Sequence, residues 1–103
     1  MFVIRVDIVA WVDDAQPGVV AARFLDAWGY EHTLIDKLPM FTAANLDQQS
    51  AYPQPGSLAC ALIERHNVAG RAISIIDIDQ PWQIESTTGT TRFEVLSEHL
   101  LEA

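Results

Sequence analysis

The sequence predicts an all-β domain, a small antiparallel barrel or sandwich of six to seven strands with one long loop at residues 42–56. Two observations support this prediction. Residues 1–12 carry an apolar side chain at every second position, which is the period of a β-strand with one buried face. The apolar segments that follow are short and are separated by turn residues, as is typical of antiparallel sheets with tight connections.

The remaining strands are expected to follow one another along the chain. Their expected ranges are 19–27, 30–41, 57–66, 71–79, 81–85 and 90–96. Gly29 and Gly70 fall between neighbouring strands, where the turn of a hairpin favours a residue that tolerates positive φ. Residues 97–103 are expected to add a final helical turn.

Residues 57–66 have a competing interpretation. The letters SLACALIERH contain good helix formers, and Ser57 suits the N-cap of a helix. We favour a strand because the segment then closes a hairpin with residues 71–79 through Gly70.

The long loop, residues 42–56, differs from the rest of the chain. It is polar and contains two prolines, and Thr42 is placed to cap a single helical turn over residues 43–47. Connections of this length are uncommon in compact domains. We therefore expect either a crossover between two edges of the sheet or a segment with a function of its own.

The basic residues support the strand assignment, because each of the six main strands contains one. They are Arg5, Arg23, Lys37, Arg65, Arg71 and Arg92. Acidic residues of neighbouring strands could pair with them across the sheet, for example Asp7, Asp36, Glu64 and Glu94. Exposed pairs of this kind contribute about 0.2–1 kcal/mol each, so they set the register more than they stabilise the fold.

Length and composition indicate one domain over residues 1–103 with a single hydrophobic core. Half of the residues are hydrophobic, yet no window approaches the ~18 consecutive apolar residues that a membrane span needs. The single cysteine, Cys60, excludes an internal disulfide and favours a reducing compartment. Nothing at the start of the chain resembles a signal segment, so we expect a cytoplasmic protein.

The charge balance restricts the partners. Six Lys and Arg residues against fourteen Asp and Glu residues give a net charge of −8. That field repels nucleic acids and anionic membrane surfaces, and it favours a basic protein or a cation. Acidity also keeps small proteins soluble, which is the simpler explanation.

The acidic residues suggest where a partner would bind. If successive strands run up and down, the turn at residues 13–18, the long loop and the segment after residue 79 share one end of the barrel. That end would gather carboxylates and aromatic rings, which suit the binding of a cationic protein. The residues that we expect to bind the partner are Asp13, Asp14, Tyr52, Asp77, Asp79 and Trp82. The alternative is that Asp is common in turns and that the aromatic rings cap the core.

The same residues suggest a divalent-cation site as a second hypothesis. Asp77 and Asp79 are two positions apart on a strand and project from one face, and Asp13 and Asp14 could approach them. The chain has no calcium-loop spacing, however, and three scattered histidines do not make a metal site. We predict no metal and no cofactor.

Catalytic motifs are not found in the sequence. There is no glycine-rich phosphate loop, no G-x-S-x-G and no C-x-x-C. Cys60 and His66 are six positions apart, but a nucleophile and its base need hydrogen-bond contact and a third, orienting group. We therefore predict that the protein is not an enzyme.

Two segments, AYPQPG at residues 51–56 and PWQIESTTGTTRFEV at residues 81–95, resemble parts of a group of short bacterial proteins without an assigned activity. In size, acidity and lack of a catalytic motif the chain is also similar to immunity proteins that neutralise bacterial toxins. This similarity implies a non-enzymatic module that masks a basic surface on a partner protein, of the immunity or antitoxin type. The other hypotheses are a small barrel that binds a ligand or divalent cation at its acidic mouth, with catalysis there, and a homodimer joined through an edge strand.

Overall fold

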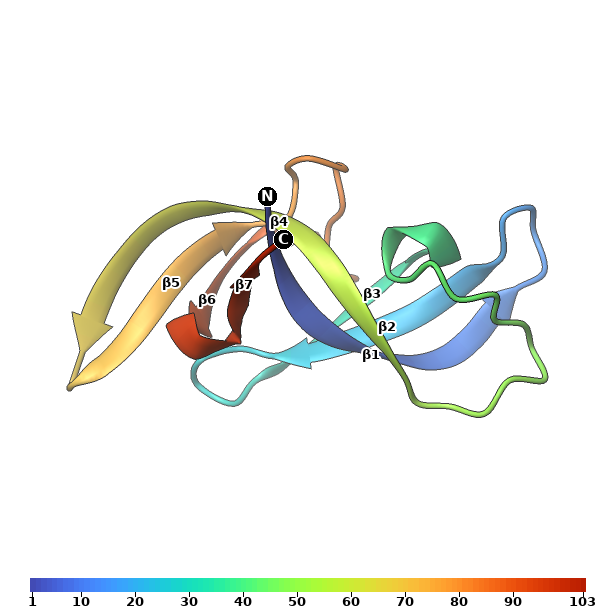
Figure 1. Ribbon diagram of the computed structural model, residues 1–103, viewed down its shortest axis with the longest axis horizontal. Helices are drawn as coiled ribbons and strands as arrows, with labels where there is room; N and C mark the ends of the chain where they lie inside the picture. The colour runs from blue at the N-terminus through green and yellow to red at the C-terminus, as the bar shows by residue number, and fades with distance from the viewer.

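Seven antiparallel strands curl into a half-barrel in the computed structural model, which describes residues 1–103 (Figure 1). The strands are β1 (Phe2–Asp13), β2 (Val19–Leu25), β3 (Glu31–Lys37), β4 (Gln54–Val68), β5 (Arg71–Asp77), β6 (Arg92–Leu96) and β7 (Leu100–Glu102). The helical segments are two 3-10 turns, η1 (Leu38–Met40) and η2 (Ser97–His99). The sheet order is β3-β2-β1-β4-β5-β6, and β7 pairs with β1. The predicted all-β class is confirmed, and residues 57–66 form a strand and not a helix.

β1 and β4 are the two long strands, and each changes partner along its length. β1 pairs with β4 over its first half and with β2 over its second half, and the two ladders overlap at Asp7 and Ile8. β4 passes from β1 to β5 between Cys60 and Ala61. Because each long strand twists as it passes from one partner to the next, the sheet wraps around a core instead of lying flat. No helix of the chain has the length and the apolar character needed to cross a membrane.

The alternating residues of β1 form the centre of the core, as the sequence pattern predicts. Ile4, Val6 and Ile8 are buried, whereas Arg5 and Asp7 between them are exposed. The three buried side chains belong to a cluster of 17 buried residues that also takes side chains from each of the other strands. One apolar strand face therefore organises the packing of the whole chain.

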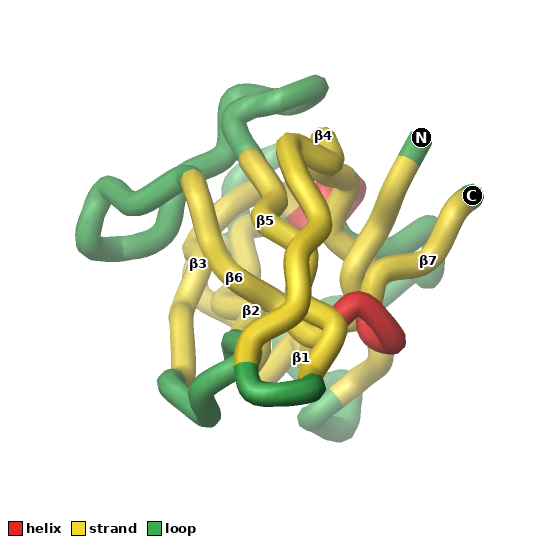
Figure 2. The backbone as a smooth tube through the Cα atoms, turned by 90° about the vertical axis from the view of Figure 1, so that its left-hand side faces the viewer, coloured by secondary structure: helices red, strands yellow, loops and turns green.

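The two edges of the half-barrel, β3 and β6, are connected through the segments beside them. The N–H of Ala27 donates to the C=O of Glu94 at 2.8 Å, and the N–H of Thr87 donates to the C=O of Thr33 at 2.9 Å. We call this region, residues 24–33 with residues 86–94, the seam. Figure 2 shows β3 and β6 beside each other there. The seam limits how far the half-barrel can open.

Residues 81–85 do not form the predicted strand. The chain between β5 and β6 folds instead as a loop, residues 78–91, in which the N–H of Ile84 donates to the C=O of Ile78 at 3.2 Å. Both isoleucines are buried in the core, so their side chains fix the loop without a ladder. The final segment differs as well, since only residues 97–99 are helical and β7 pairs with β1.

Residues 43–47 do not form the predicted helical turn. The hydroxyl of Thr42 accepts a hydrogen bond from the N–H of Ala44 at 3.0 Å, which makes a local side-chain turn in place of a helix cap. The predicted strand 30–41 ends early, at Lys37, because Pro39 has no N–H to donate to a ladder and lies within η1.

The six basic residues lie in six different strands, β1 to β6, as predicted. Two of the six pair with a carboxylate, Arg23 with Glu31 at 3.1 Å and Arg92 with Asp77 at 3.4 Å. Neither Glu31 nor Asp77 is one of the four acids expected to pair with them, which were Asp7, Asp36, Glu64 and Glu94. The basic residues therefore mark the strands correctly, whereas their pairing depends on the register.

Candidate functional site

The six predicted partner-binding residues do not lie together. Asp13 is the last residue of β1. Asp77 lies near the other end of β1, because it is opposite Ala61 of β4, and the preceding residue Cys60 is opposite Phe2. Phe2 and Asp13 are the two ends of β1, on the order of 35 Å apart along a strand of that length. The cause is that β5 pairs with the part of β4 that extends past the start of β1. The predicted single acidic mouth is therefore wrong, and so is the cation site that would need the acids of both ends.

Asp77, Asp79 and Trp82 lie at the β5 end of this arrangement. The buried carboxylate of Asp77 accepts hydrogen bonds from Nε of Arg92 at 3.4 Å and from the N–H of Asp79 at 2.9 Å, so it is engaged within the chain. Asp79 and Trp82 are exposed in loop 78–91. Nowhere do three or more His, Cys, Asp or Glu side chains come together in a way that could hold a metal ion.

At the other end, the turn at residues 13–18 and the long loop lie against each other, as predicted for these two segments (Figure 1, right-hand side). The long loop is shorter than the predicted 42–56, because β4 begins at Gln54. They enclose a groove of about 700 Å³, which we call the loop groove. Its lining comes from Trp11, residues 14–18, residues 38–39 and residues 42–49. The lining includes the carboxylates of Asp14 and Asp47 and contains no Lys, Arg or His.

Trp11 forms one wall of the loop groove. Its indole Nε1 donates to the carboxylate of Asp14 at 2.7 Å, which fixes the ring to the turn. The ring lies directly on Gly18, where an added Cβ would overlap the ring carbons. Glycine therefore leaves the space that the indole occupies.

Tyr52 holds the long loop in shape. Its hydroxyl donates to the C=O of Asp47 at 2.6 Å, and its ring packs against the core. The carboxylate of Asp47 accepts the N–H of Gln49 at 2.8 Å. Beyond the loop, the C=O of the buried Phe41 accepts the N–H of Ser57 at 2.8 Å. Tyr52 thus supports Asp47 without lining the groove.

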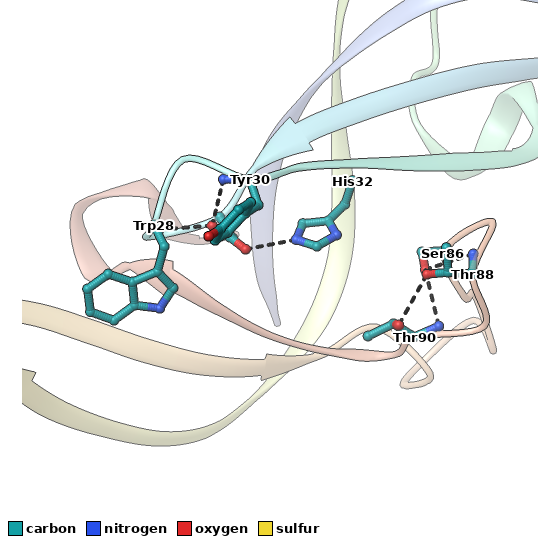
Figure 3. Close-up of polar contacts among 7 residues, drawn as sticks. Trp28, Tyr30, His32, Ser86, Thr88 and Thr90 are labelled. Atoms are coloured by element: carbon teal, nitrogen blue, oxygen red, sulfur yellow. Dashed lines mark hydrogen bonds and ion pairs between the residues drawn. The ribbon is translucent and has the colours of Figure 1, made fainter.

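The seam contains a carboxylate–histidine pair that the sequence did not suggest. One oxygen of Asp26 bonds Nε2 of His32 at 2.8 Å, and the other accepts the N–H groups of Trp28 and Tyr30 at 2.8 and 3.0 Å (Figure 3). The His32 ring packs against the ring of Phe93, with centroids 4.6 Å apart. Partial burial alone would raise the pKa of Asp26, but the hydrogen bonds from His32 and from the two N–H groups outweigh it and lower the pKa. Asp26 is therefore ionised and fully engaged with its own chain.

Loop 78–91 contributes a second polar cluster to the seam. Ser86 is buried, and its Oγ accepts hydrogen bonds from the N–H groups of Thr88 and Thr90 at 3.3 and 3.1 Å (Figure 3). The hydroxyls of Ser86 and Thr88 lie 2.9 Å apart. These contacts close the loop just before β6, so the cluster has a structural role.

Sequence reasoning missed both clusters of the seam. The position of Asp26, three residues before Gly29, does indicate a turn, since an Asp side chain accepts hydrogen bonds from the N–H groups of the residues that follow it. The contact with His32 depends on the hairpin register, in which Phe24 is opposite His32. The STTGT letters at residues 86–90 indicate a turn, but the burial of Ser86 follows from tertiary packing.

Cys60 and His66 do not form a catalytic pair. Cys60 lies in the core, where burial raises the pKa of its thiol to about 11, so the thiol is protonated at neutral pH. His66 faces Glu94 instead, at 3.5 Å. These residues therefore provide no activated nucleophile.

Comparison with family models, with curated proteins and with solved structures finds no match to this chain. A function for this chain is therefore inferred from its own geometry.

Proposed function

We propose that this chain is a non-enzymatic protein-binding module whose loop groove holds a basic, extended segment of a partner protein. The observation that supports this most is the lining of the groove, which joins apolar walls to two carboxylates and has no cationic side chain. The proposal keeps the immunity or antitoxin class expected from the sequence. It moves the contact surface from six separated residues to one groove.

The size and chemistry of the loop groove favour a peptide segment. Its volume of about 700 Å³ lies within the range of roughly 300–1,000 Å³ that is typical of binding sites. Trp11, Leu38 and Leu46 offer apolar contact area, and Trp is enriched among the residues that dominate binding energies. Asp14 and Asp47 would pair with Lys or Arg side chains of the segment.

The charge of the whole chain supports the same choice of partner. A net charge of −8 accelerates encounter with a cationic protein, and this acceleration weakens as salt screens the field. Binding in the groove should therefore depend on ionic strength.

The test is a titration of ¹⁵N-labelled protein with a decapeptide in which Lys alternates with Val and Ala. We expect the indole N–H signal of Trp11 to shift and saturate, while those of Trp28 and Trp82 stay in place, because only Trp11 lines the groove. Raising the salt from about 20 to about 300 mM should weaken binding by about tenfold. A decapeptide with Glu in place of Lys should not bind.

Two charge-matched variants separate the groove from net charge. Asp14→Asn with Asp47→Asn should weaken binding about tenfold or more, because both carboxylates of the groove are neutralised. Asp79→Asn with Glu85→Asn removes the same charge from exposed positions in loop 78–91 and should change binding less than about twofold. Equal losses in the two variants, or no shift of Trp11 with the basic peptide, would overturn the proposal.

The edge-strand homodimer receives less support. The edge of β4 that extends past β1, residues 61–68, carries the exposed charges of Glu64 and Arg65. Its register with β5 shifts between Leu62 and Glu64, as at a β-bulge. Charged side chains and bulges are features that discourage pairing between sheet edges.

A further inference from the structure

One edge of β1 is covered by two different strands with a gap between them. β7 pairs with β1 from Phe2 to Ile4, and β2 pairs with β1 from Asp7 onward. Arg5 and Val6 therefore have no strand partner on this edge, although both pair with β4 on the other edge. We call this interruption the ladder gap.

The alternation of the ladder identifies which main-chain groups face the gap. The C=O of Met1 accepts the N–H of Ala103 at 2.8 Å, so odd-numbered residues of this part of β1 direct their N–H and C=O toward the β7 edge. The pairing with β4 leads to the same assignment. Ser57 of β4 is opposite Arg5, and its N–H points away from β1 and donates to the C=O of Phe41. Arg5 thus directs one N–H and one C=O into the ladder gap.

A cavity of about 460 Å³ lies over the ladder gap. Buried side chains that include Ile4, Val6 and Phe24 line its inner part. Leu25 and Leu101 line it at the surface, where their side chains are 58% and 39% exposed. An apolar cavity with a few convergent polar groups is the usual form of a small-molecule site.

The charged groups around the cavity offset one another. Arg5 and Arg23 contribute two positive charges, and Asp7 and Glu98 contribute two negative charges. The guanidinium of Arg23 already binds Glu31 at 3.1 Å. His99 completes the polar lining. This rim does not select strongly for an ion of either sign.

We propose that the ladder gap binds a small, uncharged, planar molecule with an adjacent hydrogen-bond donor and acceptor, such as a lactam or a primary carboxamide. Its donor and acceptor pair with the C=O and N–H of Arg5, and its apolar body packs between Leu25 and Leu101. A peptide strand does not fit, because β7 and β2 occupy the ladder on both sides and leave only two residue positions open. This site is separate from the loop groove and does not depend on the proposed function.

The matched probes are 2-quinolinone, which has the lactam N–H and C=O, and N-methyl-2-quinolinone, which has the same ring system without the donor. In a ¹⁵N titration, we expect 2-quinolinone to shift the amide signal of Arg5 with saturation. The N-methyl probe should bind at least about tenfold more weakly, since it leaves the C=O of Arg5 without a partner. Equal affinity for the two probes, or no saturable shift, would overturn the proposal.

Two variants and one exchange measurement complete the test. Leu25→Trp places an indole at the mouth of the cavity and should abolish binding. Ile35→Trp places the same side chain at an exposed position of β3 that does not line the cavity, and it should bind 2-quinolinone within about twofold of the original chain. In the free protein, the amide of Arg5 should exchange its hydrogen faster than those of Val3 and Asp7, which have ladder partners. Equal protection of the three amides would show that the gap is closed and would refute the site.

Discussion

The seam and the loop groove both contain carboxylates, but they differ in where the hydrogen bonds of these carboxylates go. In the seam, the carboxylate of Asp26 bonds three donors of its own chain, and Ser86 accepts two N–H groups. In the loop groove, the carboxylate of Asp14 bonds Trp11, and that of Asp47 bonds the N–H of Gln49 and the hydroxyl of Ser50. Each of the two carboxylates uses only its Oδ1 in these bonds, and most of residues 42–49 are exposed. The polar groups of the seam therefore stabilise the fold, whereas the loop groove leaves carboxylate oxygens accessible to a partner.

The difference separates structural polar residues from candidate functional ones. A buried donor or acceptor that loses its partner costs about 1–3 kcal/mol, whereas exposed groups are solvated by water. Substitutions in the seam should consequently lower stability, and neutralisation of the groove carboxylates should change binding only.

The largest effect on stability is expected for Asp26→Ala. The change removes three hydrogen bonds to an ionised, partly buried carboxylate, and it should lower the free energy of unfolding by about 2–3 kcal/mol at pH 7 in urea denaturation. Asp79→Ala is the control, because this carboxylate is exposed, and it should change stability by less than about 0.5 kcal/mol.

The cost of Asp26→Ala should also depend on pH. Because the pKa of Asp26 is lowered in the folded chain, its stabilisation is complete above the ordinary value of 3.8 and is lost as the pH falls through the folded-state pKa. The difference in unfolding free energy between the two proteins should therefore shrink below about pH 4. A difference that stays constant from neutral to strongly acidic pH would contradict the role given to the carboxylate.

Gly18→Ala should be the next most costly change, at about 2 kcal/mol, because the methyl group displaces the ring of Trp11. Thermal or urea unfolding gives the cost, and the indole N–H signal of Trp11 reports the displacement. Gly29→Ala is the matched control. It lies at φ +84° with open space around it, so it should cost about 1 kcal/mol through backbone strain and leave the Trp11 signal unchanged.

Ser86→Ala should lower the unfolding free energy by about 1 kcal/mol, because the N–H groups of Thr88 and Thr90 lose their acceptor. Ser57→Ala, at an exposed position of β4, serves as the comparison and should change stability by less than about 0.5 kcal/mol. Similar costs for the two serines would mean that the Ser86 cluster does not stabilise the seam.

The smallest effect is expected for Asp14→Asn with Asp47→Asn, whose unfolding free energy should stay within about 0.5 kcal/mol of the original. Asn keeps an oxygen that can accept the hydrogen bonds from Trp11 and Gln49. A cost as large as that of Ser86→Ala would break the comparison, since the groove carboxylates would then be structural as well.

Much of the fold could be predicted because the signals were local. The alternation in β1 predicted its buried face, and Gly70 marked the hairpin that decided strand over helix at residues 57–66. The meeting of the 13–18 turn with the long loop also followed, since the strands between them run up and down. Residues 81–85 were assigned wrongly because two buried isoleucines, Ile78 and Ile84, hold a loop where the pattern suggested a strand.

The candidate site was only half predictable. Asp14 and the long loop were expected at one end, but Asp77 and Asp79 were expected to join them there. Nothing in the sequence indicates that β4 pairs first with β1 and then with β5. The hydrogen bonds of both ladders come from main-chain N–H and C=O groups, which nearly every residue carries.

The sequence by itself determined the all-β class, the apolar face of β1 and the distribution of one basic residue to each main strand, since side-chain alternation and turn propensities act over a few residues. Only the tertiary structure decided which carboxylates share a surface. The reason is that β4 extends past the start of β1 and carries β5 with it, so acids at the ends of different strands are set far apart.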